Sequence, residues 1–407
     1  MKHLHITALI LASLPLIAGA ADSPVPRHID TDGPSQGVET LTLQEQWRVG
    51  GEDEDVIFGR IVDLKRHPDG KVYVLDNQLC QIVVISPEGE HLTDLSRQGD
   101  GPGELRQPMG LVFLEDDVLG VGMGFPGKVV SMKTDGTPVG TQFPVGEPAE
   151  GNVGIMMSLR KVDGVQVASG GRIVFADHDK SHTERFLAVA GAGEGEFTRI
   201  LETQTPVDPT GQRFVETDNY YIDLRWALGP GGTIYAPMKR DAYEISVFDR
   251  TGKLLRVFGR EVAPRKRTQD DKDEVGPMIN VAGRPEGRQW EISDYDESVT
   301  RIMFNHDDGT VWVLTPHGAN DQPDGILETW DVFSAAGEYL KQVAIPLGDE
   351  MNDGTSYLVG GGRLVVVKGT ASSFSDANDE DEDEEFEEVE PLEVICYIMG
   401  DLNVASP

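Results

Sequence analysis

Residues 61–97 decide the fold of this chain, and they read IVDLKRHPDGKVYVLDNQLCQIVVISPEGEHLTDLSR. Four short runs of aliphatic and β-branched residues alternate with polar turns, and two of these turns contain Asp69-Gly70 and Glu88-Gly89. A tight turn between antiparallel strands needs a positive φ at one or two positions, which Gly, Asp and Asn adopt at little cost. The stretch therefore predicts four antiparallel strands that follow one another in order.

The same unit recurs along the rest of the chain. The first turn and the strand that follows it recur at residues 116–121, 170–175, 231–236, 308–313 and 361–366. The second turn recurs at residues 134–137, 250–253 and 335–338, and in the third unit we expect it within 191–196. In that third unit, the alignment places Gly170 and Gly171 in the first turn.

Six such units predict an all-β fold, a six-bladed β-propeller of four-stranded antiparallel blades. Radial closure favours this arrangement because it leaves no long exposed sheet edge. The last unit supplies only three strands, near residues 355–359, 363–368 and 393–399. Residues 39–49 have the alternating pattern of a strand, and we expect them to complete the last blade and close the ring. Seven blades are the alternative, if residues 146–162 contain further strands.

The N-terminus has the features of a signal peptide over residues 1–20, with Lys2, an apolar run and Ala18-Gly19-Ala20. We therefore expect an exported protein of the periplasm or the extracellular space, with no membrane span in the mature chain. A net charge of −35 argues against a nucleic-acid partner and against an anionic membrane surface. The two cysteines, Cys80 and Cys396, allow one disulfide at most.

We expect one propeller domain over residues 39–402, preceded by a flexible segment at 21–38, and a monomeric protein. The long inter-blade insertion at 261–298 has a weak helix signal at residues 265–275. We expect the insertion to cap the channel mouth as a lid or a partner surface. The alternative is that its basic cluster, Arg265-Lys266-Arg267, docks on the acidic loop described next.

An acidic loop is predicted over residues 371–391. Eleven of the fifteen residues from 376 to 390 are Asp or Glu. Such a block repels itself, so we expect it to be disordered.

One linker between units reads RQGDGPGEL over residues 97–105 and is followed by Gln107-Pro108-Met109-Gly110. It resembles the G-x-G-P-G-E-F/L linker of NHL-like and other bacterial six-bladed β-propellers, within the TolB-like propeller superfamily. Leu105 stands where Phe is common. The linker leads into a strand and no Gly-Lys-Ser/Thr follows, so it is not a phosphate loop. The resemblance implies the propeller fold and a scaffold role, and it implies no chemistry.

The connections between the strands of an antiparallel blade lie on two opposite faces of the propeller. The first-to-second and third-to-fourth turns form a short-turn face, and the second-to-third loops and blade linkers form a long-loop face. Variable loops on a rigid scaffold carry function, so we expect the site on the long-loop face near the central channel. His67 and His306 precede equivalent first turns, and we expect them on the short-turn face in structural roles.

The candidate binding residues are polar side chains of the long-loop face: Asp76, Asn77, Arg97, Asp100, Glu104, Asp177, His178, His182, Lys239, Arg240, His317 and Asn320. Four of them, Asp177, His178, His182 and His317, are candidate ligands for Ca or Zn. The leading prediction is a non-enzymatic scaffold that binds a protein or small-molecule ligand on this face. The alternative is a Ca- or Zn-dependent hydrolase or lyase, by analogy with lactonase-like and amidating-lyase-like propellers, in which the metal polarises a carbonyl and activates water.

Overall fold

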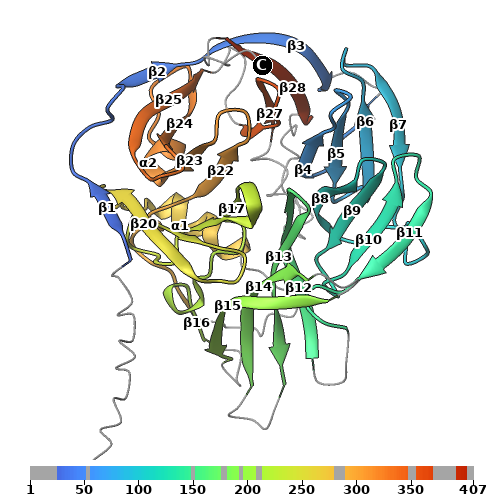
Figure 1. The fold of residues 1–407 in the computed structure, drawn as a ribbon, viewed down its shortest axis with the longest axis horizontal. Coiled ribbons are helices and arrows are strands. Elements are labelled where there is room, and N and C mark those ends of the chain that lie inside the picture. The colour runs from blue at the N-terminus through green and yellow to red at the C-terminus, as the bar shows by residue number, and fades with distance from the viewer. Residues whose placement is uncertain are drawn as a thin grey trace, which may run out of the picture.

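The computed structural model describes residues 25–51, 56–147, 152–175, 181–191, 196–207, 213–278, 289–346, 354–369 and 391–400. In these residues the strands form six blades around a central axis (Figure 1). The prediction of a six-bladed β-propeller with four-stranded antiparallel blades is confirmed. The seven-bladed alternative is wrong, because the strand within residues 146–162 is the first strand of blade 3.

The blades follow one another in sequence. Blade 1 consists of β4 (Ile61–Arg66), β5 (Val72–Asp76), β6 (Gln81–Ile85) and β7 (His91–Leu95). Blade 2 consists of β8 (Pro108–Glu115), β9 (Val118–Met123), β10 (Val129–Lys133) and β11 (Pro138–Gln142). Blade 3 consists of β12 (Asn152–Val162), β13 (Val165–Val174), β14 (His182–Ala190) and β15 (Phe197–Pro206).

The second half of the ring has two five-stranded blades. Blade 4 consists of β17 (Ala227–Leu228), β18 (Ile234–Ala236), β19 (Glu244–Phe248), β20 (Leu254–Arg260) and the added strand β1 (Arg27–Asp30). Blade 5 consists of β22 (Arg301–Asn305), β23 (Thr310–Leu314), β24 (Ile326–Phe333), β25 (Tyr339–Pro346) and the added strand β2 (Val38–Thr40). Blade 6 consists of β26 (Thr355–Leu358), β27 (Arg363–Lys368), β28 (Glu393–Gly400) and β3 (Thr42–Gly50).

The remaining elements lie in the connections between the strands of the blades. β16 (Arg213–Val215) pairs in parallel with β21 (Gln289–Glu291), and the helices are α1 (Gln269–Met278), α2 (Pro316–Asn320) and the short 3-10 helices η1 (Thr217–Asn219) and η2 (Pro230–Gly232). These elements lie in the blade linkers, except α2 and η2, which lie in connections within blades 5 and 4. No helix in the described residues is long and apolar enough to cross a membrane.

The core fills the wedges between neighbouring blades. On β5, Val72 and Val74 pack toward blade 6, whereas Tyr73 and Leu75 pack toward blade 2. Successive side chains of a strand point to opposite faces, so a strand buried on both sides reads as a continuous apolar run. Each fully buried side chain of this kind contributes about 1.5–3 kcal/mol. Because the inner strands are buried on both faces, they lack the alternation of polar and apolar residues that the outer strands have.

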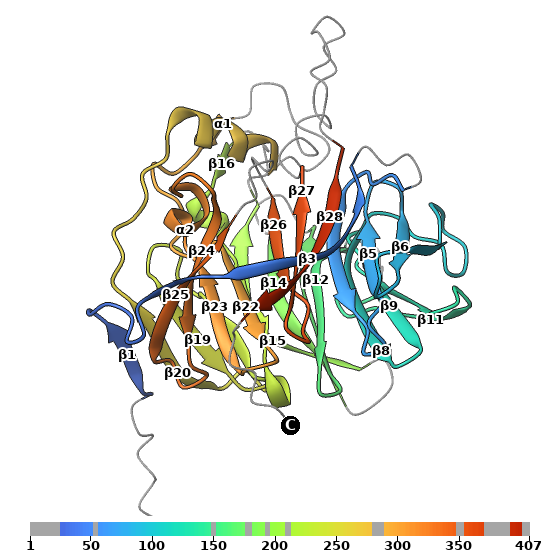
Figure 2. The same cartoon turned by 90° about the horizontal axis from the view of Figure 1, so that it is seen from above.

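The N-terminal residues 27–50 form a belt around three blades, and we refer to them as the N-terminal belt (Figure 1, Figure 2). β1 pairs in parallel with β20, and β2 pairs in parallel with β25. β3 then pairs antiparallel with β28, with Trp47 opposite Cys396, so the predicted closure by the N-terminal strand is confirmed. Within the segment expected to be flexible, residues 27–30 form a strand, because the backbone groups at the edge of β20 bind them.

Two further expectations differ from the structure. The first turn of blade 3 is at Asp163-Gly164, and Gly170 and Gly171 lie inside β13. A Cβ on Gly170 would lie 2.4 Å from the carbonyl oxygen of Ile155, so this glycine permits close strand approach and does not form a turn. The helix of the insertion starts at Gln269, four residues after the expected start, where Thr268 and Asp271 hydrogen-bond reciprocally as a cap.

The acidic run of residues 376–390 lies outside the described residues, as do residues 1–24. Cys80 and Cys396 are both buried and free.

Candidate functional site

Exposed large apolar side chains are distributed unequally over the two faces. Within the described ranges, the long-loop face has Ile57, Leu79, Phe125, Phe175, Leu224 and Tyr295 in its loops and linkers. The short turns that the structure describes contain no exposed side chain of this kind. Exposed apolar residues that gather on one face are typical of a binding surface.

A pocket of about 1260 Å³ lies on this face, beside blade 3. We call it the blade 3 pocket, and its lining residues come from 155–157, 170–175, 183–185, 204–207 and 213–225, together with Arg240. The strands of blade 3 have 9 to 11 residues, whereas those of blade 1 have 5 or 6. Blade 3 therefore extends beyond the ring and forms one wall, and the linker to blade 4 forms the other.

The wall formed by blade 3 and the start of the linker is partly apolar. Phe175 at the end of β13 is 58% exposed, and Val207 and Phe214 also line the pocket. The ring of Phe214 packs against Trp290 of β21 at a centroid distance of 5.2 Å. An apolar wall with a few polar groups is the usual composition of a site for an organic ligand.

Five arginines contribute the polar groups, against the three carboxyl residues Glu216, Asp218 and Asp223. Each arginine has an anionic partner, at the pocket or just behind it: Arg172 with Glu184, Arg185 with Asp223, Arg213 with Glu291, Arg225 with Glu297, and Arg240 with Glu216. A guanidinium has five N–H donors, so a paired arginine can still donate to a ligand. The lining therefore gathers five guanidinium groups, each beside a carboxylate, in a strongly acidic chain.

Asp223 lies in this pocket with a φ of +29°, which is rare for a residue other than glycine. Its carbonyl oxygen accepts hydrogen bonds from Ser158 Oγ at 3.1 Å, Ser169 Oγ at 2.7 Å and Trp226 Nε1 at 3.0 Å. Arg185 Nη1 donates to its Oδ2 at 3.0 Å. Burial raises the pKa of the Asp223 carboxyl, and Arg185 and Arg225 oppose this shift. Strained backbone and a shifted pKa in one pocket are typical of a functional site.

A network of ion pairs fixes the linkers that border the blade 3 pocket. Arg267 of the insertion is nearly buried and bonds Glu216 at 2.7 Å, Asp296 at 2.6 Å and Glu297 at 3.4 Å. Arg240 bonds the same Glu216 at 2.9 Å. Arg265 and Arg267 of the basic cluster thus pair with carboxylates of the linkers, whereas the acidic loop on which the cluster was expected to dock lies outside the described residues.

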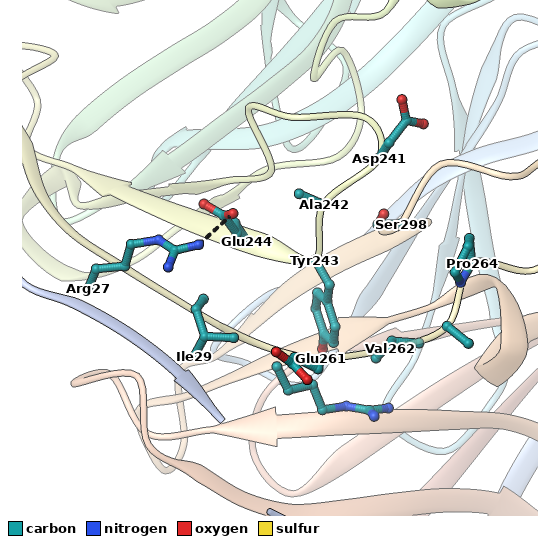
Figure 3. Close-up of a pocket in the computed structure, with 12 residues that line it drawn as sticks. Arg27, Ile29, Asp241, Ala242, Tyr243, Glu244, Glu261, Val262, Pro264 and Ser298 are labelled. Atoms are coloured by element: carbon teal, nitrogen blue, oxygen red, sulfur yellow. Dashed lines mark hydrogen bonds and ion pairs between the residues drawn. The ribbon is translucent and has the colours of Figure 1, made fainter. Parts of the chain in front are cut away.

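A second pocket, of about 600 Å³, lies between the start of the N-terminal belt and the beginning of the insertion (Figure 3). Arg27 of β1 reaches Glu244 at 2.8 Å across its entrance. Beneath it, Arg260 bonds Asp331 of blade 5 at 2.7 Å. The first pair holds β1 to β19 within blade 4, and the second connects blade 4 to blade 5, which indicates a structural role.

The structure gives several predicted candidates a structural role. Asp76 is fully buried, and its carboxylate accepts from the backbone N–H groups of Gly59, Arg60 and Leu79. Asn77 donates to the carbonyl of Pro108 at 2.8 Å, which ties blade 1 to blade 2.

The linker candidates pair among themselves. Arg97 bonds Glu104 at 2.8 Å, and Asp100 bonds Arg106 at 2.7 Å. Glu104 also accepts from Gly101 N at 2.9 Å. These three candidates therefore hold the blade linker in shape, and they do not line either pocket described above.

Four further candidates belong to blades 4 and 5. Lys239 bonds Glu244 at 3.2 Å, and Arg240 lines the blade 3 pocket. His317 lies between Asp321 at 2.6 Å and the carbonyl of Ala263 at 2.9 Å, and Asn320 donates to the carbonyl of Pro316 at 3.1 Å.

The proposed metal ligands do not come together in the part of the chain that the structure describes. His182 lies 3.5 Å from Glu184, and His317 is two blades away. Asp177 and His178 lie outside the described residues. Among the described residues there is no group of three or more His, Cys, Asp or Glu that could hold a metal ion.

The two histidines assigned to the short-turn face have structural surroundings. The His67 ring packs against Phe113 at 4.9 Å, and Nε2 lies 2.9 Å from the carbonyl oxygen of Asp116. The His306 ring packs against Phe304 at 4.9 Å, and burial lowers the pKa of its imidazole.

Comparison with known proteins supports the fold alone. No protein-family model matches the sequence, and no curated protein matches it. A member of the DUF4221 family from Bacteroides vulgatus has a TM-score of 0.53 at 13% identity, covering 88% of this chain and 98% of its own. Virginiamycin B lyase from Staphylococcus aureus has a TM-score of 0.39 at 11% identity, covering 82% and 83%. Regucalcin, a calcium-binding protein from Agrobacterium tumefaciens, has a TM-score of 0.40 at 9% identity, covering 89% and 95%. At these identities the likeness concerns architecture and assigns no activity.

Proposed function

We propose that this protein is an exported, monomeric propeller that binds an organic anion with an apolar part in the blade 3 pocket. The observation that carries the proposal is the lining of that pocket, where five arginines and the apolar side chains of Phe175, Val207 and Phe214 occur together in a chain of net charge −35. A carboxylate, sulfonate or phosphate of the ligand would accept from guanidinium donors, and its apolar part would contact Phe175 and its neighbours.

The pocket is rigid where the ligand would bind. Arg185 of β14 donates to Asn219 and Asp223 of the linker, and Arg240 donates to Glu216 of the same linker. The pairing of β13 with β14 is continuous and holds the blade 3 wall. A preformed site loses less conformational entropy on binding than a mobile one. This favours specific recognition of a small molecule over transient surface contact.

The alternative function, a Ca- or Zn-dependent hydrolase or lyase, stays a prediction. It requires at least three ligands at one point, and the described residues offer no such group. Its remaining candidates, Asp177 and His178, lie outside the described residues.

The probe for the experiment is 8-anilino-1-naphthalenesulfonate, because it combines an anionic group with an apolar ring system and becomes fluorescent in an apolar site. Binding is measured by fluorescence titration of the purified chain. Phe175→Ser and Arg213→Gln are the test variants, since Phe175 and Arg213 are solvent-exposed and line the pocket. We expect each variant to weaken binding by about tenfold, equivalent to about 1.4 kcal/mol.

Two matched variants on the same face serve as controls. Leu79→Ser removes an exposed apolar side chain outside the pocket, and Arg97→Gln removes an exposed arginine outside it. Both controls should bind the probe like the unmodified chain. Equal losses in test and control variants, or no binding by the unmodified chain, would exclude the blade 3 pocket as the site.

A further inference from the structure

Arg185 differs from the other arginines of the blade 3 pocket in the hydrogen-bond donors that it has left. In the other four, the terminal nitrogen Nη2 donates to a carboxylate: Glu184 for Arg172, Glu291 for Arg213, Glu297 for Arg225 and Glu216 for Arg240. Within the described residues, Arg185 donates only through Nη1, to the carbonyl of Asn219 and to Asp223 Oδ2, each at 3.0 Å. Its Nε and Nη2 have no hydrogen-bond partner among these residues and are open to solvent.

This free edge of Arg185 can bind two oxygens of one oxyanion. The N–H groups of Nε and Nη2 point the same way and match the spacing of two oxygens of a carboxylate, sulfonate or phosphate. Arg185 lines the pocket with a side chain that is 27% exposed, and Gly171, which lies opposite it on β13, lines the pocket without a side chain. The two contacts of Nη1 fix the guanidinium, so the free edge is oriented before a ligand binds.

Asp223 controls the charge beside this edge. Its Oδ2 accepts from Arg185, whereas its Oδ1 has no hydrogen-bond partner among the described residues and is open to solvent. While Asp223 is ionised, its charge offsets that of Arg185 and repels an approaching anion. Once it is protonated, the charge of Arg185 is no longer offset and the carboxyl group can donate a hydrogen bond. Burial raises the pKa of this carboxyl, against the opposing charges of Arg185 and Arg225.

We propose that Arg185 binds the anionic group of the ligand through Nε and Nη2, and that protonation of Asp223 strengthens this binding. The inference rests on the proposed function, and it adds to that function the residue that binds the anion and a regulation by pH. A bound anion stabilises the protonated carboxyl relative to the carboxylate, so the affinity rises as pH falls. The pocket thus binds its ligand more tightly in acidic than in neutral surroundings.

The groups that surround Asp223 do not change charge in the pH range of the test. They are two cations, two phenols and two hydroxyls: Arg185 of β14, Arg225, Tyr220 and Tyr221 of the linker, Ser158 of β12 and Ser169 of β13. The arginines stay charged, and burial raises the pKa of both tyrosines, so these phenols stay neutral. β14 also contains His182, 3.5 Å from Glu184, and a histidine changes charge near neutral pH, so His182 is replaced in a control.

The test titrates the purified full chain with 8-anilino-1-naphthalenesulfonate at several values between about pH 5 and about pH 8, at constant ionic strength. The sulfonate of this probe stays ionised throughout, and circular dichroism at each pH shows whether the chain is folded. We expect the unmodified chain to bind the probe at least about fivefold more tightly at the acidic end. Asp223→Asn is neutral at every pH and Asn tolerates the positive φ of this residue, so it should bind tightly throughout with little pH dependence.

Two substitutions test the anion contact itself. Arg185→Met keeps the apolar stem and removes the donors, and it should weaken binding of the probe by at least about tenfold at every pH. Arg185→Lys keeps a charge without the paired donors, so its affinity should be intermediate. The Lys variant also provides a readout if the Met variant does not fold.

Two further variants are controls for the pH dependence. Asp218→Asn removes the same charge from an exposed residue of the same pocket, and His182→Gln removes the histidine of β14. Both should keep the pH dependence of the unmodified chain, even if their affinities differ. If Asp223→Asn keeps it as well, or if Arg185→Met binds the probe like the unmodified chain, the inference is wrong and the proposed function stands. No binding by the unmodified chain at any pH would overturn both.

Discussion

Asp331 connects blade 4 to blade 5, and we predict that its removal is among the most destabilising single changes in this protein. Its carboxylate is 2% exposed and accepts from Arg260 Nε at 2.7 Å, Tyr243 Oη at 2.8 Å, Tyr339 Oη at 2.9 Å and Gln342 Nε2 at 2.9 Å. Tyr243 and Arg260 belong to blade 4, and the other groups belong to blade 5. One carboxylate therefore satisfies donors on both sides of the interface.

The magnitude follows from what remains after the substitution. In Asp331→Ala, the Arg260 guanidinium keeps its position without a counter-charge, and breaking a buried pair in this way costs about 3–5 kcal/mol. Arg260→Met leaves the carboxylate with neutral donors only, and its cost should lie in the same range. In Arg260→Met with Asp331→Leu, no uncompensated charge remains, so the double variant should cost much less than the sum of the two single variants.

The assay is urea unfolding at neutral pH, followed by tryptophan fluorescence. The unfolding free energies of the four proteins give the coupling energy, provided that the dependence of free energy on urea is the same in all four. We expect a coupling of at least about 2 kcal/mol. A loss below about 1 kcal/mol for Asp331→Ala, or strict additivity in the double variant, would refute the account of this interface.

Three further predictions concern closure, blade 3 and pH. Trp47→Ala in β3 should cost about 3–5 kcal/mol in urea unfolding because Trp47 is buried at the ring closure, whereas Leu92→Ala on an exposed outer strand should stay within about 0.5 kcal/mol. Gly170→Ala should cost at least about 1–3 kcal/mol because its Cβ would meet Ile155 O, and an unchanged free energy would contradict the assignment of Gly170 to a strand. Burial raises the pKa of Glu216, but hydrogen bonds from Arg267, Ser293 and Arg240 outweigh it and lower that pKa overall. This stabilisation is present above the unfolded pKa of Glu and is lost as pH falls through the lower folded value. The melting temperature of Arg267→Met should therefore approach that of the unmodified chain as pH falls below about 4, and a constant difference from pH 7 to pH 3 would contradict the role of the network.

Much of the fold was predictable from local chemistry. Turns such as His67 to Gly70 require residues that adopt positive φ, and they recur with the period of a blade. The closure by β3 was also predictable, since the last unit lacked one strand and residues 39–49 had the pattern of a strand. The added strands β1 and β2 were not predictable, because parallel pairing with an existing blade edge leaves no turn signal.

Blade 3 shows where sequence pattern alone is insufficient. Gly170-Gly171 has the composition of a turn, but the true turn is Asp163-Gly164, where Gly164 has a φ of +77°. Long-range packing against Val145 and Ile155 decides the role of Gly170, and a local pattern does not contain this information.

The candidate site was predicted by face but not by residue. The blade 3 pocket lies on the long-loop face, and among the candidates within the described residues Arg240 alone lines it. Arg185 and Asp223 were missed because an arginine within a strand and an aspartate within an irregular linker have no distinctive spacing. One available signal was the length of the linker between the last strand of blade 3 and blade 4, which does not fit the repeat. Asp76 and Glu104 accept hydrogen bonds from backbone N–H groups, a common role of a loop carboxylate that the sequence pattern does not distinguish from ligand binding.

The most direct test of the central claim is a crystal structure of the chain with bound 8-anilino-1-naphthalenesulfonate. The account predicts that the probe occupies the blade 3 pocket, with its rings against Phe175 and its sulfonate within hydrogen-bond distance of a lining arginine. Occupancy only on the short-turn face or outside blade 3, with the pocket empty, would contradict it.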